Sequence, residues 1–100
     1  MNPQVLLDAA AIVEAGWCQG ANARRADGQR CSHQDPAATQ FCLLGAVYRA
    51  AEHLHACPAT ELDAMRQHLG YEYADEFNDR PNMTAATVAE ELRKCATKTT

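Results

Sequence analysis

Cysteine and histidine side chains at short spacing could bind a metal ion in two places, Cys31-x-His33 and His53-x-His55-x-Cys57. On a helix, His53 and Cys57 stand at positions i and i+4, close enough to share one zinc ion, and Cys31 or His33 could complete a tetrahedral set. The spacing lacks the paired short repeats that are typical of zinc sites. A zinc-stabilised domain with Cys31, His33, His53 and Cys57 as ligands is therefore an alternative. We expect histidines that are solvated or cap a helix, and no cofactor.

Reduced thiols are the simplest interpretation of the cysteines. They number five, which is odd, and no two form a Cys-x-x-Cys pair. A secreted disulfide framework favours an even number and a signal sequence, whereas cytosolic proteins keep their thiols reduced. The apolar segment 5–13 contains Asp8 and has no basic residue before it, which makes it a poor signal peptide. We therefore expect a cytoplasmic protein.

Guanidinium, amide and carboxylate groups gather in the polar segment 18–35 and around residue 78. Arginines and glycine-rich backbone could bind an anion, but the segment contains no phosphate-binding or dinucleotide-binding motif. A bidentate contact between Arg24 and Asp79 would anchor the polar segment on the helices, and we favour this structural role over ligand binding. The residues predicted to form the binding surface are Gln19, Arg24, Arg25, Arg30, Asn78 and Asp79.

Composition excludes several classes of protein. A formal charge of −4 argues against general nucleic-acid binding, which requires a basic face. No apolar run approaches the roughly 18 residues that a membrane span needs. Alanine contributes 20 residues, while Val, Ile and Leu together contribute 13, so we expect a small core with closely packed helices. A core this small would gain from a dimer interface, and a homodimer is an open alternative.

Apolar residues at helical spacing predict helices at about 3–16, 36–56, 60–69 and 84–96, with a further helical turn within 71–77. Caps support the starts of three of them, because Asn2 and Asp35 each precede a proline and Thr84 opens the last helix. Gly45 lies inside the longest predicted helix, where glycine is costly. We expect another backbone to approach closely there.

The polar segment 18–35 separates the first two predicted helices. Its Asp27-Gly28 pair predicts a two-residue type I′ hairpin turn, or else an ordered loop. The fold class is therefore predicted to be all-α. We expect a single domain over residues 1–100, a compact bundle of four to five short helices with a polar loop or short hairpin insertion between the first two.

Three blocks follow in order: Gly16-Trp17-x-Gln19-Gly20 with Ala23-Arg24-x-Ala26-x-Gly28, then Phe41-Cys42-Leu43-Leu44-Gly45-Ala46, then Phe77-Asn78-Asp79. In these blocks the chain resembles a small family of bacterial proteins of unknown function, found especially in actinobacteria and in phages. The resemblance spans roughly residues 5–96 and implies an all-helical fold, with no established activity and no catalytic residues. Arg25 departs from the acidic residue that such sequences often carry.

The resemblance also makes Cys42 the candidate nucleophile. A reactive cysteine needs a neighbouring base and a lowered thiol pKa. The predicted helix 36–56 places Cys42 far from the amides at its amino end, and the neighbours of Cys42 are apolar. Burial raises the pKa of a thiol, so we expect Cys42 to pack rather than react.

These observations predict a small non-enzymatic interaction module that binds a larger protein through the polar segment and an adjoining helix face. The occurrence of the resembling family in phages implies a narrower form, an accessory protein that inhibits a host defence complex such as a CRISPR effector. The alternatives are a small enzyme that depends on Cys42 or on a carboxylate site around Asp79, and the zinc-stabilised domain. We expect a protein partner, no membrane contact and no direct contact with nucleic acid.

Overall fold

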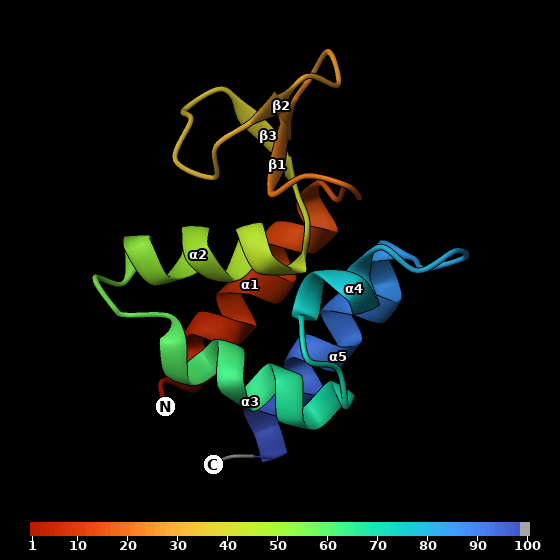
Figure 1. Cartoon of the computed structure of the whole chain (residues 1–100). Helices are drawn as coiled ribbons and strands as arrows, with labels where there is room; N and C mark the ends of the chain where they lie inside the picture. The colour runs from red at the N-terminus through yellow and green to blue at the C-terminus, as the bar shows by residue number, and fades with distance from the viewer. Residues whose placement is uncertain (99–100) are drawn as a thin grey trace.

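The computed structural model describes residues 1–98, which form five helices and one three-stranded antiparallel sheet (Figure 1). In chain order the elements are α1 (Pro3–Ala15), β1 (Ala23–Arg25), β2 (Arg30–Cys31), β3 (Ala38–Phe41), α2 (Leu43–His53), α3 (Ala59–Leu69), α4 (Ala74–Asn78) and α5 (Ala85–Lys98). Within this part of the chain, no helix is both long and apolar enough to span a bilayer.

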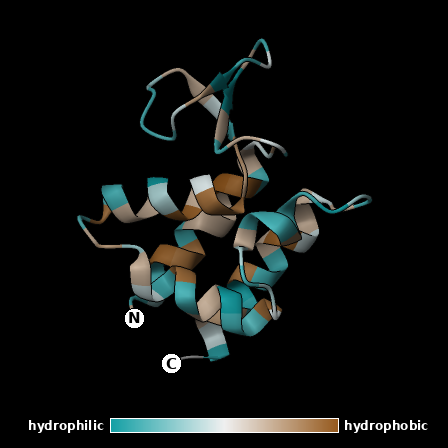
Figure 2. Ribbon diagram, in the orientation of Figure 1, coloured by the Kyte–Doolittle hydropathy of each residue, from teal (hydrophilic) through white to brown (hydrophobic). Residues whose placement is uncertain are grey.

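The helices form a body in which α1 packs against both α5 and α2 (Figure 1). The side chain of Asn2 accepts a hydrogen bond from the backbone N–H of Gln4 and so caps α1 as predicted. Few large side chains are fully buried, and alanines fill much of the space between the helices, which agrees with the small core that composition predicted. Figure 2 shows that the strongly apolar segments lie in the helices, whereas the sheet and its loops are largely hydrophilic.

Residues 19–41, here called the arm, carry the sheet and project from the helical body (Figure 1). Its middle strand β1 pairs with β2 on one side and β3 on the other. Between β1 and β2, Arg25 N donates to Gln29 O at 2.9 Å and Gly28 N donates to Arg25 O at 2.8 Å. Gly28 has a φ of 88°, but Asp27 is not among the residues with positive φ. This is a three-residue loop, so the predicted type I′ turn is wrong although Asp27-Gly28 does mark a hairpin.

The prediction of an all-α fold is wrong, because the arm contributes three strands. The predicted helix 36–56 begins only at Leu43. Asp35 caps a single turn instead, with its carboxylate accepting from Ala37 N at 2.8 Å and its carbonyl from Ala38 N at 3.0 Å. The next residues form β3, whose Phe41 also bridges to Trp17. The helical pattern misled because Phe41 falls in step with the apolar stripe of α2.

Two glycines allow the arm to lie directly on the helical body. A Cβ at Gly45 in α2 would stand 1.9 Å from the carbonyl oxygen of Asn22, and a Cβ at Gly16 would stand 2.1 Å from that of Thr39. Both contacts are with backbone, which cannot turn aside as a flexible side chain can. The predicted close approach at Gly45 is therefore confirmed, and the neighbouring backbone belongs to the arm.

Candidate interaction site

Asn78, at the end of α4, is fully buried where the arm meets the helices. Its Oδ1 accepts from Trp17 Nε1 at 2.8 Å and from Leu43 N at 3.0 Å. Its Nδ2 donates to Cys18 O at 3.1 Å and to Asp79 Oδ1 at 3.0 Å. These four hydrogen bonds use the full capacity of a side-chain amide. Asn78 therefore joins the end of α4, the start of α2 and the base of the arm.

A second set of hydrogen bonds ties the beginning of the arm to the loop after α4. Gln19 Nε2 donates to the carbonyl oxygens of Asn78 at 3.0 Å and of Arg80 at 3.1 Å. Gly20 N donates to Asp79 Oδ1 at 3.0 Å. The arm is thus anchored on the loop after α4 through the side chain of Gln19 and the backbone amide of Gly20, and not through the guanidinium that the sequence suggested.

Arg24 and Arg25 hold the arm together from within. Arg24 donates from Nη1 to Gly28 O at 2.9 Å and from Nη2 to Gln19 O at 3.0 Å, so the predicted contact with Asp79 is replaced by contacts inside the arm. Arg25 forms an ion pair with Asp35 at 2.8 Å. Hydrogen bonds from Ala37 N and from Arg25 hold the pKa of the Asp35 carboxyl below its ordinary value.

Arg30 differs from the other two arginines of the arm. It lies on β2 with an exposed side chain, and within residues 1–98 its guanidinium makes no hydrogen bond or ion pair. The hairpin loop before it, residues 26–29, is exposed throughout. Of the six predicted binding residues, Gln19, Asn78 and Asp79 come together at the base of the arm, Arg24 and Arg25 brace it, and Arg30 is exposed on β2.

Sequence reasoning missed the contacts that hold the loop between β2 and β3 on α2. Glu52 Oε1 is 3.1 Å from His33 Nε2 and accepts from Gln34 Nε2 at 2.6 Å. Arg49 Nη1 donates to His33 O at 2.7 Å, and the His33 ring stacks on Tyr48 with centroids 5.1 Å apart. Hydrogen bonding, chiefly from Gln34 and then from His33, lowers the pKa of Glu52. No local spacing signals these contacts, because they join residues 15 to 19 positions apart.

Cys42 is the N-cap of α2, since its Sγ accepts from Gly45 N at 3.3 Å. The predicted position deep inside a helix is therefore wrong, but the predicted burial is confirmed, with 2% of the residue exposed. Burial raises the pKa of the Cys42 thiol to about 11, despite opposing hydrogen bonds from the amides of Gly45 and Leu44. At neutral pH the group is a thiol, which is a poor nucleophile.

The four residues of the zinc alternative do not form a site. Among residues 1–98, no group of three or more His, Cys, Asp or Glu side chains is arranged to hold a metal ion. His33 faces Glu52 and Tyr48, while Cys57 is exposed two residues before α3 begins. Cys31, His33, His53 and Cys57 are therefore not gathered as the spacing suggested.

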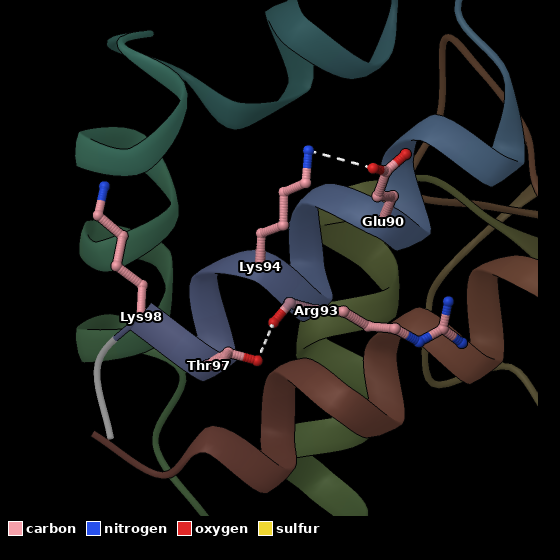
Figure 3. A pocket seen from close by; sticks show the side chains of 5 residues that line it. All are labelled: Glu90, Arg93, Lys94, Thr97 and Lys98. Carbon is pink, nitrogen blue, oxygen red and sulfur yellow. Dashed lines mark hydrogen bonds and ion pairs between the residues drawn. The ribbon is translucent and has the colours of Figure 1, made fainter.

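A hollow of about 490 Å³ lies on α5, among Glu90, Arg93, Lys94, Thr97 and Lys98 (Figure 3). Its charges are largely neutralised within the chain. Arg93 pairs with Glu14 of α1, and Lys94 lies 3.1 Å from Glu90 and 3.3 Å from Glu91. This hollow lies on the helical body, apart from the arm, and we do not assign it to the interaction site.

A model of one protein family matches residues 1–98, which is nearly the whole chain. The chain belongs to DUF6197, a family of unknown function. No curated protein and no solved structure matches it. Membership of DUF6197 confirms the resemblance to a family without an assigned activity, and the five helices and small sheet described above give the fold of this member.

Proposed function

We propose that this DUF6197 protein is a non-enzymatic interaction module whose arm contacts a larger protein. The observation that carries the proposal is the contrast between the two ends of the arm. Its base is fixed by the fully satisfied amide of buried Asn78, whereas its hairpin tip is exposed and polar. A rigidly positioned polar tip loses little conformational entropy when it binds.

The distribution of charge supports an acidic partner surface. The arm carries three arginines and two aspartates, a formal charge of +1, whereas the whole chain is −4. The rest of the chain therefore carries −5, which makes the arm the basic end of an acidic molecule. Arg30 is the side chain best placed to use this asymmetry, because Arg24 and Arg25 are already engaged within the arm. Arginine is also among the residues that most often dominate binding energy at interfaces.

The burial and raised pKa of Cys42 favour this proposal over a cysteine-dependent enzyme. The carboxylate of Asp79 accepts hydrogen bonds from Gly20 N and Asn78 Nδ2, which suits a structural role better than acid–base chemistry. Inhibition of a host defence complex, such as a CRISPR effector, is the narrower form of the proposal. It rests on the resemblance alone and stays a prediction.

Affinity capture from a lysate of the native host tests the proposal. We expect wild-type protein to retain one partner in stoichiometric amount, and Arg30→Ala to weaken that complex about tenfold or more, as a dominant interface arginine would. Arg93→Ala is the matched control, because it removes an exposed arginine from α5 instead of the arm. The absence of any stoichiometric partner, or equal binding by wild type and Arg30→Ala, would count against the arm as the contact surface.

A further inference from the structure

A groove crosses the helical body between α2, α3 and the segment that leads into α4. Two adjoining hollows of about 180 and 310 Å³ share Tyr48, Leu62 and Arg66. Tyr73, Ala74 and Asp75 line the end beside α4, and Pro58 and Ala59 line the end beside the start of α3. Together the hollows fall within the size range of small-molecule sites in proteins.

Five polar groups line this groove, and three of them have no partner among residues 1–98. Within residues 1–98, the hydroxyls of Tyr48 and Tyr73 and the carboxylate of Asp75 make no hydrogen bond or ion pair. The other two groups, the guanidinium of Arg66 and the carboxylate of Asp63 one turn before it on α3, pair with each other. That pair is exposed to solvent, and such pairs contribute little to stability. A ligand carboxylate can therefore replace Asp63 as the partner of Arg66 at small cost.

The guanidinium of Arg66 and the carboxylates of Asp63 and Asp75 differ in charge, while the lining apart from these groups and the two tyrosine hydroxyls is largely apolar. Arg66 supplies a positive fork for a carboxylate, and Asp75 supplies a negative group for an ammonium ion. Leu62 and Pro58, with the ring of Tyr48, offer an apolar surface in the larger hollow. An apolar site with a few converging polar groups of both signs is suited to a small zwitterion with an apolar side chain.

We propose that this groove binds a free α-amino acid with an aromatic or large aliphatic side chain. Its carboxylate pairs with Arg66, its ammonium group pairs with Asp75, and its side chain lies against Tyr48 and Leu62. The site lies on the helical body and uses none of the residues assigned to the arm. It therefore stands or fails independently of the proposed interaction function.

Titration of the ¹⁵N-labelled full chain, followed by two-dimensional NMR, tests the proposal. The probes are L-phenylalanine, L-phenylalaninamide, which lacks the carboxylate, and 3-phenylpropanoate, which lacks the ammonium group, all at about pH 6, where these groups are charged. We expect L-phenylalanine to shift amide signals around Leu44, Tyr48, Leu62 and Tyr73. Each analogue should bind about tenfold more weakly, because each lacks one charged hydrogen bond.

Two variants assign the ends of the ligand. Arg66→Gln should bind L-phenylalanine and its amide equally, and Asp75→Asn should bind L-phenylalanine and 3-phenylpropanoate equally. Arg93→Gln on α5 and Asp8→Asn on α1 change charges outside the groove and should behave as wild type. The proposal is overturned if L-phenylalanine shifts no signals in the groove, or if wild type binds all three probes with the same affinity. The second comparison needs no variant, so it decides the question even if a substitution disturbs folding.

Discussion

The indole Nε1 of Trp17 donates a hydrogen bond to Oδ1 of Asn78, 2.8 Å away across 61 positions of sequence. This contact joins Trp17, which directly follows the C-cap of α1, to the last residue of α4. The same Oδ1 accepts from the first amide of α2, so one oxygen sets the positions of three segments. Because Asn78 is fully buried, water cannot replace these bonds without opening the junction.

Asn78→Ala should destabilise the protein by at least about 3 kcal/mol, because several buried groups lose their partner at once and each costs about 1–3 kcal/mol. That is a large share of the stability of a small domain. Urea unfolding followed by the fluorescence of Trp17 measures the loss, since Trp17 is the single tryptophan of the chain. Asn78→Asp keeps the accepting oxygen but turns a second oxygen towards the carbonyl of Cys18 and the carboxylate of Asp79, so we expect it to be no more stable than Asn78→Ala.

Gln67→Ala serves as the control, because Gln67 is exposed on α3. It should change the free energy of unfolding by less than about 0.5 kcal/mol. If Asn78→Ala behaved like Gln67→Ala, the amide of Asn78 would not hold the arm in place.

Gly45→Ala should destabilise the protein although it lies within α2, where alanine is normally the better residue by about 1 kcal/mol. The added methyl group would overlap the backbone of Asn22, and forced overpacking costs about 1–3 kcal/mol. Thermal unfolding followed by circular dichroism shows whether the substitution lowers or raises the stability. Ala11→Gly, at an exposed position of α1, shows the ordinary helix preference and should cost about 1 kcal/mol. A more stable Gly45→Ala protein would show that the arm does not approach α2 so closely.

Local chemistry predicted most of the helices and one of the contacts of the arm. Caps and apolar spacing placed α1, α3 and α5 within a few residues of their observed bounds, and Thr84 accepts from Thr87 N at 3.2 Å as a cap should. The cost of glycine in a helix pointed to the close approach at Gly45. These signals act within a turn or two of the chain, so a sequence displays them directly.

The features that could not be predicted from the sequence depend on pairing between residues far apart in the chain. The residues of β3 carry no alternation that marks a strand, and they become one because β1 offers them partners across the arm. Arg24 was the plausible partner for Asp79 by charge, yet a backbone amide of Gly20 occupies that place. The groove at Tyr48 gathers residues from three elements whose spacing carries no shared motif. Pairing of this kind depends on the folded backbone and not on residue type alone.

Cys57 should react with a thiol reagent well before Cys42 in the folded protein. Cys57 is exposed, whereas Cys42 is buried and burial raises its pKa to about 11, so almost none of it is thiolate near pH 8. Labelling with 5,5′-dithiobis(2-nitrobenzoate), followed by peptide mass spectrometry, gives the order of reaction. Cys57→Ser should remove the fast phase and leave the slow ones, and unfolding in urea should make all remaining thiols react at similar rates. Fast labelling of Cys42 in the native state would contradict this prediction and support the alternative of a cysteine-dependent enzyme.

Stability should fall as pH rises from about 9 to 11, in part because of Cys42. Burial raises the pKa of this thiol in the folded state above its ordinary value of 9.0. The unfolded chain therefore loses the proton first, and the stability that the neutral thiol contributes is fully present below pH 9 and lost as pH passes through about 11. The difference between the pKa of the thiol in the folded and unfolded states corresponds to about 2–3 kcal/mol of unfolding free energy. Cys18 and Cys95, whose pKa values burial also raises, act in the same direction.

Cys42→Ser isolates the contribution of Cys42, because serine does not titrate in this range and is a good N-cap for α2. Urea unfolding at a series of pH values should give a shallower decline for Cys42→Ser than for wild type between pH 9 and 11. Other groups that ionise at high pH are common to both proteins and cancel in the difference. Parallel declines would mean that Cys42 ionises as readily in the folded protein as in the unfolded chain, and that its burial at the start of α2 is incomplete.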